Sequence, residues 1–467
     1  MGYRLREFDA ESKFIGELTV EAIGRAVPMR EVKAVIEETG TQHIRERKLH
    51  MAAIVFLIIA MGIYAHLSIG DVMRKLAQGL RFVWPNPSHR LPRDSALTYR
   101  RYQLGARPLV RLFHRVCRPM TTPQTRGAFL FGLRMMAIDG TVEDAPDTPE
   151  NAAVFGRHHG DRGDSAFPQL QGVYLAECGS HAIVDAGFWP YRVSERVGGF
   201  RMLRSVGPGM LVMWDRGFHD YDMFARARGR DAHVLGRLPA NVKLQRTQTL
   251  PDGSYLAYLR PSDYVRRKQG ERLRVRLIEY TLTDPALPGY GETHRLVTTL
   301  LDPQAYPALD LACAYHERWE IEIVIDEVDT HQRLVGRPLR SLKPVGVIQE
   351  LYGLLIAHYA VRFLMHEAAH QADLDPDRLS FVRALRVIAD AIPEFQMVAL
   401  DQLDQLHARL LQDIADGRIP ERRQRSNPRV VKRKMSNFRL KRPEHQHWPQ
   451  PTLPFRQSVP LFERYCI

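Results

Sequence analysis

The hydrophobic pattern predicts a helical region at the start of the chain. Residues 14–84 carry apolar positions at helical spacing, and prolines within residues 85–92 then end the pattern. Inside this region, residues 51–70 contain no Lys, Arg, Asp or Glu and are long enough to cross a membrane. Because polar residues and glycines dilute the second half of this run, and the sequence has no other run like it, a buried helix is favoured over a membrane span.

Further along, two apolar runs each stop at an aspartate. The run GLRMMAID reaches Asp139, and the run GPGMLVMWD reaches Asp215. Both patterns predict a strand that delivers a carboxylate to a loop. Between them, QLQGVYLAEC and HAIVDAGFWP flank a Gly-Ser turn and predict an antiparallel hairpin. If the strands of Asp139 and Asp215 are neighbours in a parallel part of one sheet, their carboxylates face each other.

The remaining pattern predicts an α/β protein with a mixed sheet. Strand-like runs alternate with turn residues after residue 242, and helical patterns dominate from residue 303 to about residue 415. The predicted segments are a helical N-terminal domain (1–95), the first part of a core (96–242), a β-rich insertion (243–302), the second part of the core (303–375) and a helical, basic C-terminal region (376–467).

One predicted helix, residues 311–334, carries three polar side chains on one face. Tyr315, Arg318 and Glu322 stand at offsets that place them within about 60° of each other around a helix. Glu322 is therefore a candidate third carboxylate beside the two aspartates, while Arg318 and Tyr315 could hold a phosphate. Carboxylates of this kind suit Mg²⁺, or Mn²⁺, and such ions promote in-line displacement at phosphorus. The alternative carboxylates nearby are Glu317, Glu320, Asp326 and Glu327.

Charge indicates a polyanionic partner. The chain has 66 Lys and Arg against 53 Asp and Glu, a formal net charge of +13. Residues 418–442 hold eleven basic residues and one acidic residue. Composition alone does not say whether the partner of this segment is nucleic acid or a membrane, but no lipid anchor accompanies the basic residues. The candidate phosphate contacts are Arg429, Lys432, Arg433 and Lys434.

The cysteines and the N-terminus favour a cytoplasmic protein. The four cysteines lie far apart and form neither a CxxC pair nor a disulfide-dense pattern. The first residues, MGYRLREFDAESKF, carry charges throughout and lack the apolar core of a secretory signal.

Taken together, the motifs resemble the insertion-element-four family of bacterial DDE transposases. The resemblance rests on AIDGT, PDTPENAAVFGR, WDRGF and YHERWEIE, and the N-terminal stretches EETGTQHIRERKLH and GDVMRKLAQGLRFVW extend it over nearly the whole chain. It implies an RNase H-like core with a β-rich insertion before the helix that carries the catalytic glutamate. It also implies Asp139, Asp215 and Glu322 as the metal-binding catalytic triad, and Tyr315 and Arg318 as contacts to transposon-end phosphates.

The same resemblance implies a reaction and partners. Water attacks first at the element end, and the liberated 3′-hydroxyl then attacks, so the enzyme cleaves DNA and transfers a strand. The expected partners are double-stranded transposon ends and target DNA, held by a homodimer in a synaptic complex, with no membrane involved.

One position departs from the family pattern. The family has a lysine seven residues after the glutamate, and this chain has Asp329 there. A lysine would neutralise phosphate, whereas an aspartate repels it; Arg333 or Lys343 could substitute. Two hypotheses therefore stay open, an active transposase and a catalytically impaired, transposase-derived DNA-binding protein.

Overall fold

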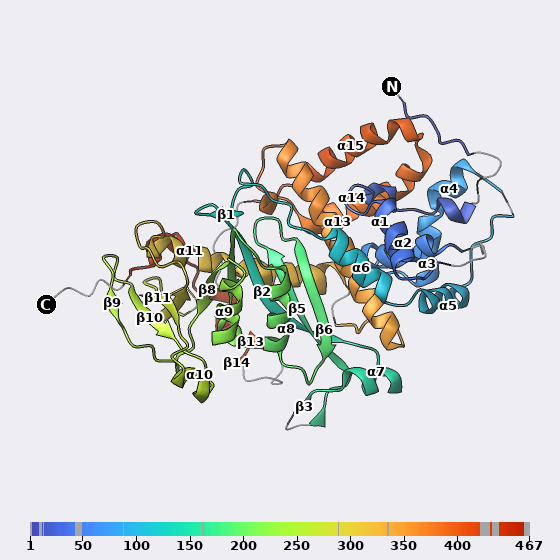
Figure 1. Ribbon diagram of the computed structural model, residues 1–467. Coiled ribbons are helices and arrows are strands. Elements are labelled where there is room, and N and C mark those ends of the chain that lie inside the picture. The colour runs from blue at the N-terminus through green and yellow to red at the C-terminus, as the bar shows by residue number, and fades with distance from the viewer. Residues whose placement is uncertain are drawn as a thin grey trace. The chain divides into compact units, whose positions relative to one another are not determined.

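The computed structural model describes most of the chain and divides it into two compact units. Described are residues 2–8, 12, 14–42, 49–86, 88–160, 163–287, 289–333, 336–420, 430–431 and 439–461. The first unit comprises Met1–Phe129, Met136–Ser205 and Glu320–Ile419, and the second comprises Leu130–Met135, Val206–Trp319 and Pro420–Ile467. Figure 1 labels the elements of both units. The division of the sequence into five segments remains a prediction.

The first unit begins with helices, as the hydrophobic pattern predicts. The last of those in the predicted helical region ends at Val83, before the run of prolines, and the next begins at Asp94. The helices are α1 (Met29–Glu38), α2 (Met51–Ile63), α3 (Ile69–Leu76), α4 (Gln78–Val83), α5 (Asp94–Leu104) and α6 (Arg107–Val116).

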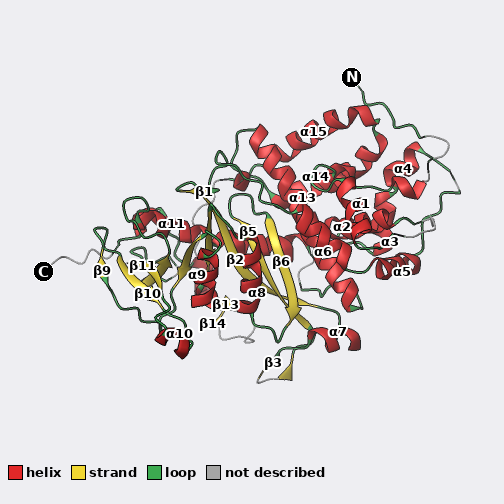
Figure 2. Cartoon of the chain, viewed as in Figure 1, coloured by secondary structure: helices red, strands yellow, loops and turns green. Residues whose placement is uncertain are grey.

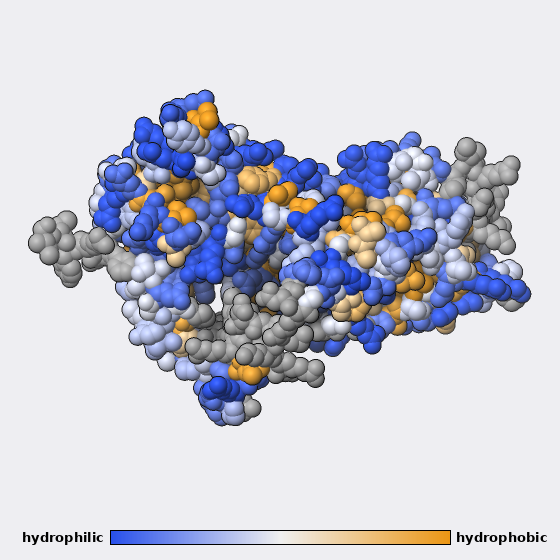
Figure 3. All heavy atoms as spheres, turned by 90° about the horizontal axis from the view of Figure 1, so that it is seen from below, coloured by the Kyte–Doolittle hydropathy of each residue, from blue (hydrophilic) through white to orange (hydrophobic). Residues whose placement is uncertain are grey.

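The apolar run at residues 51–70 begins with a buried helix, α2 (Met51–Ile63), and for this part the favoured interpretation is confirmed. Helix α2 packs against the long helix α13 (Pro344–Gln371), and Figure 1 shows the two running close together. Their approach requires glycine, because a Cβ on Gly353 would lie 2.7 Å from Ile58 Cγ2. Among the residues that the structure describes, no helix is both long and apolar enough to cross a membrane. On the face drawn in Figure 3, hydrophobic residues form small patches among hydrophilic ones.

The predicted helix over residues 311–334 is wrong as a single element. Helix α11 (Ala308–Glu317) ends at Arg318, α12 (Trp319–Asp326) follows, and a π-helical segment, η5 (Glu327–Gln332), completes the region. The Arg318 N–H bonds to the carbonyl of Tyr315 at 3.2 Å, which is a tight turn rather than an α-helical bond. Because the helix is interrupted, a uniform angle per residue does not relate Tyr315 to Glu322.

The helices that complete the first unit follow α13 and confirm the helical pattern up to about residue 415. They are α14 (Phe381–Met397) and α15 (Leu403–Ala415), with the short 3₁₀ segment η6 (Pro376–Arg378) before them. Two shorter helices, α7 (Pro149–Phe155) and α8 (Glu195–Met202), accompany the strands of this unit.

In the first unit, three antiparallel strands lie in the order β6-β5-β2, side by side in Figure 2. Strands β5 (Gln169–Glu177) and β6 (Ile183–Pro190) confirm the predicted hairpin. Strand β2 (Leu133–Asp144) differs from the prediction, because it continues five residues past Asp139. Residues 140–144 keep pairing with β5, so Asp139 lies inside a strand rather than at its end. The short strands here are β1 (Phe129–Leu130), β3 (His159–Gly160) and β4 (Gly163–Asp164).

The second unit holds the other part of the sheet, and the predicted β-rich insertion continues it. The first residues of β2 belong to this unit, where the Arg134 N–H donates to the Gly209 carbonyl at 2.8 Å. The strand order there is β2-β7-β8-β12-β11-β10-β9, with β7 and β8 parallel. The strands are β7 (Met210–Trp214), β8 (His233–Arg237), β9 (Gln248–Thr249), β10 (Tyr255–Leu259), β11 (Leu273–Tyr280) and β12 (His294–Thr298).

Three helices and two short paired strands complete the second unit. The helices are α9 (Tyr221–Arg228), α10 (Tyr264–Lys268) and α11, and the strands are β13 (Val430–Val431) and β14 (Arg439–Leu440). The predicted α/β fold is confirmed: the chain forms a mixed sheet, and helical regions precede and follow its strands in the sequence.

Candidate active site

Asp139 is held in the middle of β2, in the first unit. It lies opposite Tyr174 of β5 in the antiparallel register, and its side chain is half-buried. The N–H of Gly140 donates to Asp139 Oδ1 at 2.9 Å. The strand therefore fixes the backbone on both sides of Asp139, and a local hydrogen bond orients its carboxylate.

Asp215 directly follows β7 in the second unit, as the sequence predicts. The preceding strand is core, since Trp214 is completely buried and packs edge-on against Phe224 with ring centroids 5.2 Å apart. Asp215 then caps a short 3₁₀ turn, and its Oδ1 accepts a hydrogen bond from the Gly217 N–H at 2.7 Å. Its half-buried carboxylate is thus placed by a buried strand on one side and a capped turn on the other.

The structure brings Tyr315 and Arg318 together with Asp215 in the second unit. The Tyr315 hydroxyl donates to the carbonyl of Trp214 at 3.3 Å, next to Asp215. Burial is the main cause that raises the pKa of Tyr315 to about 12, and the charge of Asp215 adds to it against the opposing effect of Arg318. The guanidinium carbon of Arg318 lies 5.7 Å from the Tyr315 ring centroid. A phenol, a guanidinium and a carboxylate therefore share one locality.

Glu322 lies on α12 in the first unit and is half-buried. Two of the alternative carboxylates near it are engaged elsewhere in this unit. Glu320 Oε2 lies 2.7 Å from His181 Nε2, and Glu327 is buried against Arg362, whose Nε donates to it at 2.9 Å. Asp326 forms an ion pair with His331 at 3.1 Å. Glu320, Asp326 and Glu327, three of the alternative carboxylates, are thus each held by a contact within this unit.

Asp329 packs against the strand that carries Asp139. Thr141 Oγ1 donates to Asp329 Oδ2 at 2.9 Å, and Arg333 Nη1 lies 3.7 Å from Asp329 Oδ1. Arg333 also pairs with Glu143, a buried residue of β2. Burial, with the neighbouring charge of Glu143, raises the pKa of Asp329 to about 8. The sequence offers Arg333 and Lys343 as cations that could substitute for the expected lysine. Arg333 lies beside Asp329, whereas the Lys343 Nζ lies 5.3 Å from the centroid of the Tyr102 ring.

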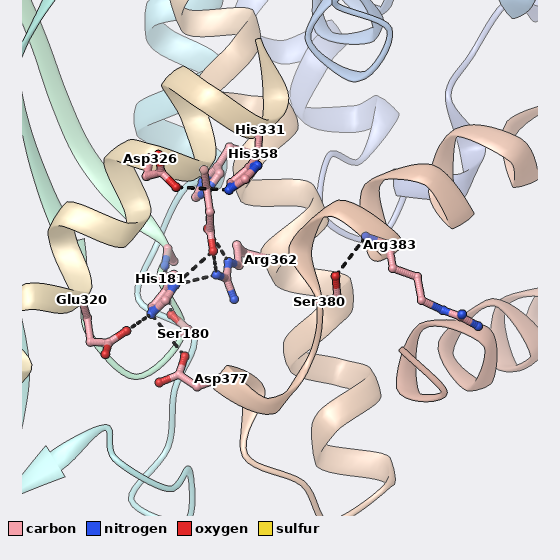
Figure 4. Close-up of polar contacts among 12 residues, drawn as sticks. Ser180, His181, Glu320, Asp326, His331, His358, Arg362, Asp377, Ser380 and Arg383 are labelled. Atoms are coloured by element: carbon pink, nitrogen blue, oxygen red, sulfur yellow. Dashed lines mark hydrogen bonds and ion pairs between the residues drawn. The ribbon is translucent and has the colours of Figure 1, made fainter. Parts of the chain in front are cut away.

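Sequence reasoning missed a cluster of buried charged groups behind α12, which Figure 4 shows. Glu327 is held there by Arg362 and by His358, whose Nε2 lies 3.1 Å from Glu327 Oε2. Burial opposes ionisation of Glu327, but Arg362 and the histidines outweigh it and hold its pKa well below the usual range. His181 and Arg362 stand on elements far from Glu327 in the sequence, so periodicity gave no signal for their meeting.

Four candidate DNA contacts in the basic region, Arg429, Lys432, Arg433 and Lys434, lie outside the described residues. Their role remains a prediction.

Two family models match the chain. One is described as "Insertion element 4 transposase N-terminal" and matches residues 17–114, and the other as "Transposase DDE domain" and matches residues 131–360. A curated relative is "Transposase InsG for insertion sequence element IS4" of Escherichia coli strain K12, 27% identical over 442 residues, which are 92% of this chain and 93% of that protein.

A second curated relative and one solved structure also match. "Putative transposase InsZ" of the same organism is 28% identical over 207 residues, 42% of this chain and 64% of that protein. The solved structure is a cryo-EM structure of the piggyBac transposase synaptic complex with hairpin DNA. The match covers 91% of this chain and 90% of the chain in that structure, with a TM-score of 0.45 and 11% sequence identity.

The two family models and the curated relatives agree with the motifs of the sequence. A DDE domain has an RNase H-like fold, binds DNA and uses divalent metal ions to cut and join it. Since one family model covers residues 17–114, the other covers residues 131–360, and a curated relative aligns along almost the whole length, the chain belongs to the insertion-element-four family of DDE transposases.

Proposed function

We propose that Asp139, Asp215 and Glu322 form the catalytic, metal-binding triad that cleaves the ends of an insertion sequence and joins them to target DNA. The observation that supports this proposal is the hydrogen bond of Tyr315 to the Trp214 carbonyl, because it brings one of the two proposed phosphate contacts next to Asp215. Glu320 and Glu327 have partners of their own in His181 and Arg362, and the sequence motif favours Glu322 as the third carboxylate.

The donor atoms fit Mg²⁺, with Mn²⁺ as a replacement. All three side chains offer hard carboxylate oxygens, which these ions prefer over nitrogen or sulfur. The backbone N–H groups of Gly140 and Gly217 each orient one oxygen of an aspartate, at 2.9 Å and 2.7 Å. When bound, the ions would supply an activated water and stabilise the leaving oxygen at phosphorus.

Arg318 and Tyr315 have a binding role in this proposal. The guanidinium forms charge-assisted hydrogen bonds with phosphate oxygens, which position the element end without reading its sequence. The pKa of Tyr315, raised to about 12, keeps its hydroxyl protonated at neutral pH, so it does not act as a base. To donate to a phosphate, the hydroxyl must turn away from the Trp214 carbonyl, to which it donates in the structure.

Asp329 is compatible with activity. Its pKa of about 8 means that the carboxyl is largely protonated at neutral pH, and Arg333 lies within 3.7 Å to compensate the remaining charge. The repulsion of phosphate that the sequence suggests is thereby reduced. This favours an active transposase over the impaired DNA-binding protein.

The proposal extends to assembly and location. Two copies of the chain hold two transposon ends in a synaptic complex, while Arg429, Lys432, Arg433 and Lys434 contact phosphates of the duplex. Work on chromosomal DNA places the protein in the bacterial cytoplasm, associated with the nucleoid when bound. Sedimentation of the protein with and without end DNA tests the dimer, since a single copy on two ends would contradict it.

A nicking assay tests the triad. Purified full-length protein is incubated with a labelled duplex that carries the element end, and Glu322→Gln is compared with Asp326→Asn on the same helix. We expect cleavage to fall by about 10²-fold or more in Glu322→Gln, because metal-ion stabilisation contributes several kcal/mol to such reactions. Equal cleavage by both variants would contradict the assignment, and retained DNA binding shows that the variants are folded.

A further inference from the structure

Three side chains that could hold a metal ion, none of them a member of the proposed triad, come together at α12, as Figure 4 shows. His181 lies in the turn between β5 and β6, Glu320 on α12 and Asp377 in η6. His181 Nε2 is 2.7 Å from Glu320 Oε2 and 3.2 Å from Asp377 Oδ1. One ligand atom of each residue lies within 4.8 Å of the other two.

We propose that His181, Glu320 and Asp377 bind a divalent transition-metal ion of the Zn²⁺ type at a structural site distinct from the catalytic one. The residues offer one imidazole nitrogen and two carboxylate oxygens, a donor set that suits Zn²⁺ with a water in the fourth position.

The geometry requires little rearrangement. Around Zn²⁺, with ligand bonds of about 2.0–2.1 Å, the ligand atoms of a tetrahedron lie about 3.3 Å apart. The contact of His181 Nε2 with Asp377, at 3.2 Å, is close to that spacing, whereas its contact with Glu320, at 2.7 Å, must lengthen by about 0.6 Å to admit the ion. The side chain of His181 is 0% exposed, that of Glu320 13% and that of Asp377 26%. The site is therefore mostly shielded but open on the side of Asp377, where a water can complete the ligand set.

A second carboxylate is placed to orient the imidazole. Glu327 Oε1 lies 3.4 Å from His181 Nδ1, so it can accept a hydrogen bond from an Nδ1–H when the lone pair of Nε2 faces the ion. Carboxylates in this position commonly fix metal-binding histidines. Arg362 Nη2, which can only donate, also approaches His181 Nδ1, at 2.5 Å, so metal binding at Nε2 requires this N–H to turn away from Nδ1 and towards Glu327, which already accepts from Arg362 Nε at 2.9 Å.

The surroundings of the imidazole stabilise positive charge. Glu320 and Asp377 place two carboxylates beside Nε2 of His181, at 2.7 Å and 3.2 Å, and their negative charge favours a cation there. The carboxylates therefore contribute both ligand atoms and electrostatic stabilisation.

The site would act on the helix that carries Glu322. Glu320 and Glu322 are two residues apart on α12, about 200° around the helix, so their side chains leave different faces. An ion at the site would tie α12 to the β5–β6 turn and to η6. An ion that binds the folded state but not the unfolded state stabilises the folded state. The stabilisation grows with the logarithm of the ratio of the ion concentration to the dissociation constant.

The test begins with full-length protein in which the proposed triad is disabled by Asp139→Asn, Asp215→Asn and Glu322→Gln, so that catalytic metal binding does not contribute. After EDTA treatment and dialysis against Zn²⁺, the bound metal is measured by elemental analysis. We expect one retained equivalent, an increase of the unfolding temperature with Zn²⁺, and, with Co²⁺ as a probe, visible absorption bands of a low-coordination site.

Matched variants assign the ligands. In the same background, Asp377→Asn and Glu320→Gln are expected to weaken Zn²⁺ binding at least about 10-fold, in line with the loss of a ligand or of its support. Asp326→Asn, which lies on α12 outside the cluster, should bind like the parent. The proposal would be overturned if the parent bound no Zn²⁺, or if both ligand variants bound Zn²⁺ as tightly as the parent does. The cluster would then be a metal-free group of ion pairs. Circular dichroism of each variant establishes that it is folded.

Discussion

Thr141 donates a hydrogen bond to Asp329 Oδ2 at 2.9 Å, from a position two residues beyond Asp139 on β2. Asp329, at the position where the family resemblance predicts a lysine, is therefore hydrogen-bonded to the strand of a proposed catalytic aspartate. Arg333 lies 3.7 Å from the same carboxyl group, so the substitution places an acid and a base together at this position. This arrangement underlies the first two predictions.

Asp329 should make the stability of the protein depend on pH. Its pKa is raised from 3.8 to about 8 on folding, so between these values the folded state holds a proton that the unfolded state releases. Stability from this group is present at low pH and is lost as pH rises towards 8. Asp329→Asn cannot lose a proton, so its urea midpoint relative to wild type should rise from pH 5 to pH 9. Asp413→Asn is the surface control. If the difference in urea midpoint between Asp329→Asn and wild type stays the same from pH 5 to pH 9, the pKa of Asp329 is not raised.

Wild-type protein should cleave its element end without a lysine at position 329. The charge of Asp329 is already reduced by its raised pKa and by Arg333, so Asp329→Lys should not be needed for activity. The assay compares the metal-dependent nicking rates of wild type and Asp329→Lys on one substrate. If only Asp329→Lys cuts, the chain is an impaired transposase that binds DNA without processing it.

Arg318→Ala should weaken binding to end DNA and reduce its salt dependence. Loss of one phosphate contact lowers the slope of log affinity against log salt by about 1. Fluorescence anisotropy over a range of salt concentrations measures both quantities. Arg409→Ala, an exposed arginine on α15 that pairs with Glu394 at 3.7 Å, serves as the control. Identical slopes for the two variants would remove Arg318 from the binding site.

Glu327→Gln should destabilise the first unit strongly. Removing one partner of a buried ion pair typically costs about 3–5 kcal/mol, because the other charge is left buried. Here Arg362 would lose its carboxylate partner, as would His358. The folded-state pKa of Glu327 is depressed, so its contribution is present above the unfolded pKa and lost as pH falls. Urea unfolding measures the loss, and the exposed Glu394→Gln should be close to neutral.

Gly353→Ala should destabilise the contact between α2 and α13. The added methyl would lie 2.7 Å from both Ile58 Cγ2 and the Ile58 carbonyl oxygen, closer than packing allows. Overpacking of this kind costs about 1–3 kcal/mol. Gly207→Ala, where no atom lies within 4 Å of the added carbon, is the control. Thermal unfolding of both variants would show the difference, and equal midpoints would mean that the two helices can separate slightly at little cost.

Much of the fold follows from local patterns. The run before Asp215 predicts a strand because it is short, apolar and followed by a turn residue, and β7 ends at Trp214 accordingly. The hairpin of β5 and β6 follows from alternation and its turn. The strands of the insertion were predictable for the same reason. Their place in the same sheet as β7 and β8 was not predictable, because strand order depends on contacts between distant segments.

The local pattern fails where tertiary contacts decide. The region of Tyr315 to Gln332 has helical periodicity throughout, yet it breaks at Arg318 and becomes π-helical at Glu327. The π-helical turn directs Glu327 towards Arg362 and Asp329 towards Thr141, and neither partner is near in sequence. The strand through Asp139 extends for a similar reason, since its pairing with β5 continues beyond the apolar run.

The most direct test of the proposed triad is a metal-specificity switch at Asp215. The variant Asp215→Cys replaces a hard oxygen ligand by a softer sulfur, which binds Mn²⁺ better than Mg²⁺. Cleavage of a labelled element end is measured for wild type and Asp215→Cys in Mg²⁺, in Mn²⁺ and with EDTA. The account predicts that wild type cuts with either ion, and that the variant is inactive in Mg²⁺ and regains cleavage in Mn²⁺. Undiminished cleavage by the variant in Mg²⁺, or cleavage by wild type with EDTA, would contradict metal binding by Asp215.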